Sequence, residues 1–85
     1  MNKIKYNFYD KNTVEFNTTF VDDIDFNWVA EHNFNVRYTE TRSSKFVEII
    51  NEFQRRGYVL KVVQEPVVIN GLEISPNLIA FFLKN

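Results

Sequence analysis

The segment QEPVVINGLEISPN, residues 64–77, contains two short aliphatic runs that are joined by Asn-Gly at positions 70–71 and bounded by Pro66 and Pro76. An Asn-Gly pair between apolar runs is a strong signal for a β-hairpin with a two-residue loop, because both loop positions require a positive φ. The sequence therefore predicts an Asn-Gly β-hairpin over residues 67–74.

The predicted hairpin carries an apolar patch. A two-residue loop determines which residues pair across the strands, and such partners share a face of the hairpin. Val68 and Glu73 then lie on one face, and we expect Pro66 and Pro76 to stop the ladder from extending as regular central pairing. The patch either folds over the core of the domain itself or binds another protein, which can be a second copy of the chain or a target. The residues of the patch are Val67, Ile69, Leu72 and Ile74.

The main helix is expected in the segment SSKFVEIINEFQRRG, and we place it at about residues 44–56. Ser43 or Ser44 is expected to cap its start, and Gly57 provides the left-handed residue at which helices commonly end. Apolar residues recur with the α-helical spacing, which predicts that one face of the helix packs against a sheet. That face consists of Phe46, Ile49, Ile50 and Phe53.

A second, short helix over about residues 23–32 is predicted by the segment VDDIDFNWVAEH, with Asp22 or Asp23 as its cap. Apolar alternation or continuous apolar runs predict the strands. These lie at residues 4–8, 14–20, 34–41, 58–65 and 78–85. The elements together predict a single α+β domain over residues 1–85, with a mainly antiparallel sheet and the main helix on one face of it.

From residue 46 to residue 84 the pattern resembles small α+β domains of unknown function found in bacteria and their phages. In these domains an amphipathic helix ends with a hydrophobic residue that is followed, after three further residues, by a glycine and an aromatic residue. The chain then enters a β-hairpin whose last strand is apolar and ends at a basic residue. Tyr58 stands where Trp is more usual, and the Asn-Gly hairpin is an insertion. The resemblance implies a fold and no activity. The matching positions are Phe53, Gly57, Tyr58, Leu60, Phe81, Phe82, Leu83 and Lys84.

The composition argues against several kinds of chemistry. The chain has no Cys, which excludes disulfides, thiolate zinc sites and cysteine nucleophiles. His32 is the only imidazole, and the sequence places no nucleophile beside it. Both glycines are explained by the helix end and the hairpin loop, which leaves no glycine-rich phosphate loop. We therefore expect no enzymatic activity, no metal and no cofactor.

The sequence pattern contains neither a membrane span nor a signal peptide. The longest apolar run falls well short of the roughly 18 residues of a membrane span. The start at residues 1–5 lacks the apolar segment of a signal peptide. We expect a cytoplasmic protein without membrane contact.

Charged residues are unevenly distributed although the formal net charge is −1. Acids dominate the first part of the chain, and bases dominate residues 37–61. Either the acidic or the basic group can form a binding surface, or both can belong to an ordinary solvated surface. Tyr38 lies in the basic segment but shares strand parity with Val36, so we expect it to be buried. The acidic candidates for partner binding are Asp22, Asp23, Asp25 and Glu31. The basic candidates for nucleic-acid binding are Arg37, Arg42, Lys45, Arg55, Arg56 and Lys61.

The function that these features favour is a small protein-binding module. Its size and its frequent use of residues with AT-rich codons indicate a phage or mobile-element accessory protein that inhibits a host protein, such as a defence nuclease of the CRISPR type. Two alternatives stay open. The chain can be a nucleic-acid-binding protein that uses the basic segment, or a homodimeric structural protein.

Overall fold

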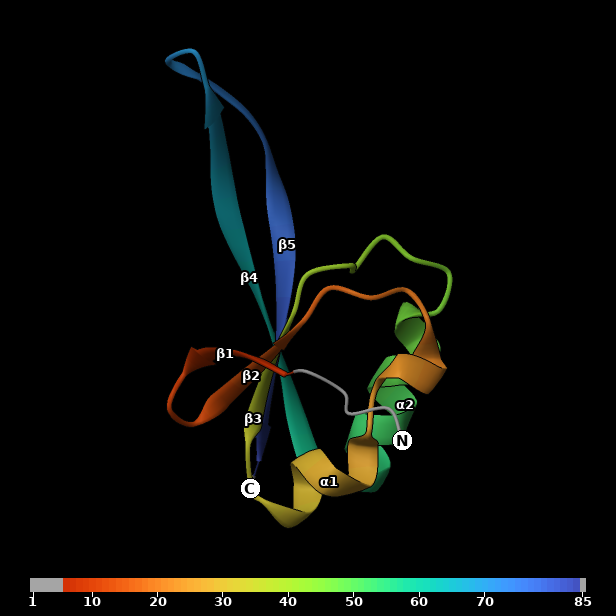
Figure 1. The fold of residues 1–85 in the computed structure, drawn as a ribbon. Helices are drawn as coiled ribbons and strands as arrows, with labels where there is room; N and C mark the ends of the chain where they lie inside the picture. The colour runs from red at the N-terminus through yellow and green to blue at the C-terminus, as the bar shows by residue number, and fades with distance from the viewer. Residues whose placement is uncertain (1–5, 85) are drawn as a thin grey trace.

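A computed structural model describes residues 6–84, except for the side chains of residues 74–76, and shows a five-stranded sheet flanked by two α-helices (Figure 1). The fold is α+β, as predicted. The strands are β1 (Asn7–Asp10), β2 (Thr13–Phe16), β3 (Asn35–Tyr38), β4 (Tyr58–Ile69) and β5 (Leu72–Lys84). The helices are α1 (Phe26–Glu31) and α2 (Phe46–Arg55), and a 3₁₀ turn covers Val21–Asp23.

The sheet has the strand order β1-β2-β3-β5-β4, so β1 and β4 form its two edges. All neighbours are antiparallel except β2 and β3, which run parallel. A parallel pair requires a crossover connection, and the segment that contains α1 provides it. The sheet is therefore mixed, with mainly antiparallel pairing.

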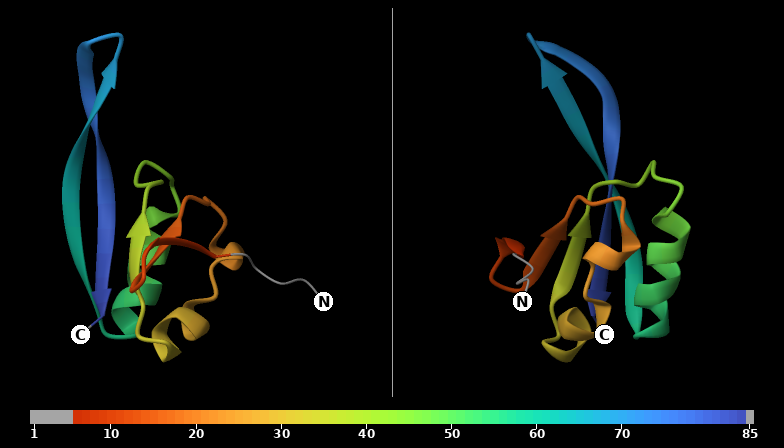
Figure 2. Two further views of the ribbon diagram at one scale, coloured as in Figure 1. Left: turned by 60° about the vertical axis from the view of Figure 1, so that its left-hand side comes forward. Right: turned by 45° about the vertical axis from the view of Figure 1, so that its right-hand side comes forward.

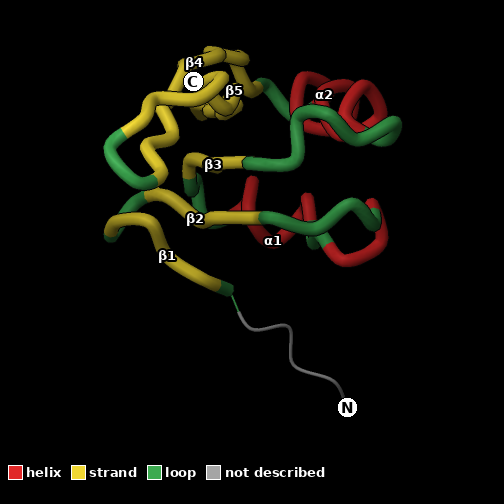
Figure 3. Tube along the Cα trace, turned by 90° about the horizontal axis from the view of Figure 1, so that it is seen from above, coloured by secondary structure: helices red, strands yellow, loops and turns green. Residues whose placement is uncertain are grey.

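Both helices lie beside the same face of the sheet, which Figure 3 shows from above. The core between the helices and the sheet centres on Phe53 of α2. Its ring centroid lies 4.6 Å from that of Phe82 on β5 and 4.8 Å from that of Phe26 on α1. The fully buried large side chains are Tyr38, Phe53, Phe82, Ile49, Val14, Val29 and Val36. The burial of Tyr38 confirms the expectation from strand parity.

The short second helix is interrupted where the sequence predicted a continuous one over residues 23–32. Ile24 has extended backbone angles and is 4% exposed, so burying this side chain separates the 3₁₀ turn from α1. The cap of α1 is Asp25, whose Oδ1 accepts a hydrogen bond from the backbone N–H of Trp28 at 3.1 Å. The expectation that Asp22 or Asp23 caps this helix is wrong.

The main helix is shorter at its start than predicted. It begins at Phe46, and Ser43 instead accepts a hydrogen bond from the N–H of Lys45 in the turn that precedes the helix. After Arg55 the chain leaves the helix through Gly57, whose φ of +87° confirms the left-handed residue at the helix end. The rings of Phe53 and Tyr58 meet across this turn with 5.1 Å between centroids.

The first hairpin also differs from the prediction: β1 runs to Asp10 rather than to residue 8, and residues 4 and 5 of the predicted strand lie outside the described part of the chain. β2 ends at Phe16, whereas the prediction continued to residue 20. Phe20 is 70% exposed and β3 has only four residues, ending at Tyr38, so the sheet at this end has no longer strand for β2 to follow.

The largest difference from the prediction is the length of the last hairpin. β4 and β5 pair continuously from Tyr58 opposite Lys84 to Ile69 opposite Leu72, with one shift in register between residues 65 and 67. The ladder extends past Pro66, but on an edge strand and with its register shift at this residue, which agrees with the expectation that Pro66 prevents regular central pairing. The pair that flanks a two-residue loop is hydrogen-bonded, and alternation from Ile69 turns the backbone of Pro66 toward the open edge of the sheet, where its missing N–H breaks no bond to β5.

Candidate protein-binding surface

The outer part of the long hairpin projects from the rest of the molecule (Figures 1 and 2). β3 pairs with β5 only at residues 80–82, so the hairpin continues beyond the sheet as two strands alone. We call residues 66–77 the arm. The arm contributes to an elongated shape with extents of 42 × 28 × 27 Å.

The pairing within the arm matches the prediction from the Asn-Gly loop. Val67 pairs with Ile74, Val68 with Glu73, and Ile69 with Leu72, and Asn70 and Gly71 both have positive φ, of 52° and 78°. Val67 and Ile74 thus share a face with Ile69 and Leu72. The side chain of Ile74 lies outside the described residues.

The described part of the patch is not folded over the core. Ile69 is 54% exposed and Leu72 is 71% exposed, while Val68 on the opposite face is 63% exposed. Only Val67 is half-buried. The interpretation that this face packs on the domain's own core is therefore wrong, because the neighbouring strand β3 is too short to bring any described element alongside the arm.

The base of the arm is joined to the sheet by Arg37 of β3, on the face that neither helix covers. Its guanidinium forms ion pairs with Glu15 of β2 and with Glu65 of β4, the latter at 2.8 Å between Nη2 and Oε1. The ring of Tyr9 covers the guanidinium, with 5.0 Å from Cζ to the ring centroid. Arg37 thus links β3 to the adjacent β2 and, across β5, to β4.

Burial and charge act in opposite directions on Arg37. Desolvation works to lower the pKa of its guanidinium, but the hydrogen bonds and charges of Glu65 and Glu15 together outweigh it and leave the pKa raised. Its side chain is 13% exposed, and Nε is buried without a hydrogen-bond partner among residues 6–84. Arg37 is therefore held as a cation inside the sheet surface and has little of its charge available to a ligand.

The four acidic candidates are exposed, and two of them have structural partners. Asp25 caps α1, and Asp23 Oδ2 accepts a hydrogen bond from the Thr18 hydroxyl at 2.8 Å. Asp22 and Asp23 line a shallow depression of about 460 Å³ with Phe20, Lys45 and Glu48, so both signs of charge meet there. Glu31 ends α1. Of these four residues, Asp22 and Asp23 line the depression.

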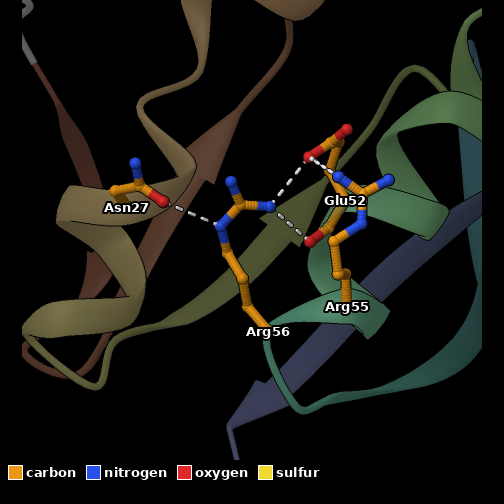
Figure 4. Close-up of polar contacts among 4 residues, drawn as sticks. All are labelled: Asn27, Glu52, Arg55 and Arg56. Carbon is orange, nitrogen blue, oxygen red and sulfur yellow. Dashed lines mark hydrogen bonds and ion pairs between the residues drawn. The ribbon is translucent and has the colours of Figure 1, made fainter.

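The six basic candidates are dispersed over the molecule. Arg55 and Arg56 share Glu52, with 3.2 Å and 2.8 Å from its Oε1 to their Nη1 atoms (Figure 4). Arg56 also donates to Oδ1 of Asn27 on α1 at 3.1 Å, so it joins the two helices. The hydrogen bond from Arg56, and then the charges of Arg55 and Arg56, lower the pKa of the Glu52 carboxyl.

The other bases lie elsewhere. Lys45 precedes α2 at the end opposite to Arg55, and Arg42 is exposed in the preceding turn. Lys61 and Arg37 both stand opposite Phe81 of β5, one on each side, so these two share the helix-free face. The structure brings the bases together only in pairs.

His32 and the acids do not form a group that could hold a metal ion within the described residues. The His32 ring lies at the end of α1, where Nδ1 is 2.8 Å from the carbonyl oxygen of Trp28 and the ring stacks on Phe34. No group of three His, Asp or Glu side chains in the described range is arranged to hold a metal ion. No helix in that range is long and apolar enough to cross a membrane.

Sequence reasoning missed the ion pairs of Arg37 with Glu15 and Glu65. The parity of residues 14–16 and of residues 34–38 places Glu15 and Arg37 on the face opposite to the core, which was the available signal. The pairing order of the strands was not visible in the sequence.

In comparisons with known proteins, no protein-family model, no curated protein and no solved structure matches this chain.

Proposed function

We propose that this chain is a non-enzymatic protein-binding module that contacts its target through the arm. The observation that carries the proposal is the exposure of the apolar side chains at the arm tip, where Leu72 is 71% exposed and Ile69 is 54% exposed on one face. Contiguous exposed apolar patches on proteins mark sites of interaction with other proteins.

The geometry of the arm supports recognition of another protein. A two-stranded projection offers aliphatic side chains on both faces and can enter a groove or lie along a sheet of the target. The ion pair of Arg37 with Glu65 holds the base of the arm against the sheet, which reduces the conformational freedom lost on binding. The target we propose is a host protein, of which a defence nuclease is one example.

The test is capture of a target by the wild-type chain and its loss in an arm variant. Ile69→Glu combined with Leu72→Lys removes the apolar pair, keeps the net charge and places opposite charges across the strands, so the hairpin should persist. Phe20→Glu combined with Val47→Lys is the matched control, because these residues are 70% and 65% exposed and lie outside the arm.

We expect a protein that resists nuclease treatment of the lysate to bind in stoichiometric amounts to the wild type and the control but not to the arm variant. Purified target should show the same pattern in calorimetry. Equal binding by the arm variant, or capture that disappears with nuclease, would overturn the proposal; the latter would favour the nucleic-acid-binding alternative instead.

A further inference from the structure

β4 is an edge strand of unusual length. It has 12 residues, whereas strands in globular proteins usually have about 3 to 10, and β5 is its only neighbour among the described strands. The backbone groups on its open side are free to pair with another strand, and Val59 and Val62 are each 49% exposed along it. An edge of this kind either carries residues that prevent pairing or pairs with a strand of another chain.

The charges on β4 are complementary to a second copy of the same strand. Lys61 and Glu65 lie four residues apart on the helix-free face, about 13 Å along the strand, which is too far for them to pair within one chain. If two β4 strands pair antiparallel about a two-fold axis at Val63, each Lys61 faces Glu65 of the second copy. Glu65 uses Oε1 for Arg37 and retains Oε2 for this contact.

Neighbouring registers lack this match. A two-fold axis at residue 61 places the two lysines opposite each other, and an axis at residue 65 does the same for the two glutamates, which is unfavourable in both cases. With the axis at Val63, Val59 of each copy also faces Val67 of the other, so an apolar pair follows the charged pair at each end.

The backbone also allows this register. The alternation that turns Pro66 toward the open edge turns Leu60, Val62 and Gln64 the same way, so Val62 and Gln64 of the two copies form hydrogen-bonded pairs across the axis. Pro66 falls opposite Leu60, where its missing N–H removes one bond at each end of the ladder.

We propose that two copies of this chain join edge to edge through antiparallel β4 strands with the two-fold axis at Val63, forming one continuous sheet of ten strands. The arms of the two copies then point in opposite directions, and only the first residues of each arm lie beside the other copy's β4, with Pro66 opposite Leu60 and Val67 opposite Val59. The dimer does not depend on the arm's binding a target, since it uses the strand edge and leaves β5 free.

Charge reversal provides the first test. Lys61→Glu gives a homodimer with two Glu–Glu contacts, and Glu65→Lys gives one with two Lys–Lys contacts, so each variant alone should weaken the dimer about 10- to 100-fold. An equimolar mixture of the two variants restores both opposite-charge contacts and should form heterodimers. Native mass spectrometry separates these species by mass, and sedimentation velocity measures their affinities.

Two controls accompany the mixture. Lys11→Glu makes the same charge change in the loop between β1 and β2, and it should leave the dimer intact. Glu65→Gln removes the contact with Arg37 without introducing repulsion, and should weaken the dimer less than Glu65→Lys. A monomeric wild type would overturn the proposal and identify Lys61 and Pro66 as residues that block the edge. Single variants that remain dimeric would overturn it as well.

Cysteine crosslinking tests the register. The chain has no Cys, so Val63→Cys introduces a single thiol beside the axis, at a non-hydrogen-bonded pair where side chains of the two copies are close enough for a disulfide. We expect mild oxidation to link Val63→Cys into a dimer and to leave Val59→Cys monomeric on a denaturing gel. Efficient linking of Val59→Cys but not of Val63→Cys would reject this axis.

Discussion

Nη2 of Arg37 lies 2.8 Å from Oε1 of Glu65, and this ion pair crosses β5 on the face of the sheet that the helices leave open. Arg37 stands opposite Phe81 and Glu65 stands opposite Asn77, so the two side chains meet diagonally over Ile79. Ile79 is 4% exposed although no helix covers this face. The ion pair and the ring of Tyr9 over the guanidinium both lie on this open face.

Replacing Arg37 with Met should lower the free energy of unfolding by about 1–3 kcal/mol, because it leaves two carboxylates without their partner. Glu65→Gln should cost less than about 1 kcal/mol, since Arg37 still pairs with Glu15. Urea denaturation of the two variants measures both values. Equal losses in the two variants would contradict a central role for Arg37.

Phe53→Ala should lower the free energy of unfolding by about 3–5 kcal/mol, because Phe53 is fully buried among the rings of Phe26, Tyr58 and Phe82. Leu72→Ala should change it by less than about 0.5 kcal/mol, since the side chain is 71% exposed. Chemical denaturation checks both. A large loss at Leu72 in the monomeric protein would mean that the arm packs on the domain.

Gly57→Ala and Gly71→Ala both place a Cβ at positive φ, which costs roughly 1 kcal/mol or more at either position. Their consequences should differ. Gly57 links α2 to β4, so its substitution should lower global stability, whereas Gly71 lies at the arm tip and should mainly loosen the arm. Hydrogen exchange resolves the two effects, with faster exchange confined to β4 and β5 near the loop in Gly71→Ala.

Stability should fall between about pH 10 and pH 12 because of Tyr58. Burial raises the pKa of its phenol from 10.0 to about 12, and the hydroxyl donates to the carbonyl oxygen of Phe34 at 2.6 Å. The folded state therefore keeps a proton that the unfolded state releases, so its contribution is complete below pH 10 and disappears as pH rises through 12.

The control for this titration is Tyr58→Phe, which lacks the phenolic proton. Tyr6 and Tyr38, whose pKa values burial also raises, are present in both proteins. The difference between the two unfolding free energies, measured by denaturation from pH 9 to pH 12, therefore reports Tyr58 alone. Identical pH dependence in the two proteins would contradict the raised pKa.

Local backbone requirements could be predicted from the sequence. The Asn-Gly loop determined the pairing of Val67 with Ile74 and of Ile69 with Leu72, since a two-residue turn with positive φ at both positions admits one register. Gly57 ended the main helix for the same kind of reason. These features depend on residues that are close in the chain, and the sequence contains them.

Only the tertiary structure decided how far the hairpin extends and what covers it. Pro66 was expected to prevent regular central pairing, and the ladder passes it on an edge strand, where its missing N–H is harmless. Which strand becomes an edge depends on the order of the whole sheet. The parallel pairing of β2 with β3 and the ion pair of Arg37 with Glu65 arise in the same way. Alternation along a strand shows which side chains share a face, whereas burial of that face depends on the length and position of strands elsewhere in the chain.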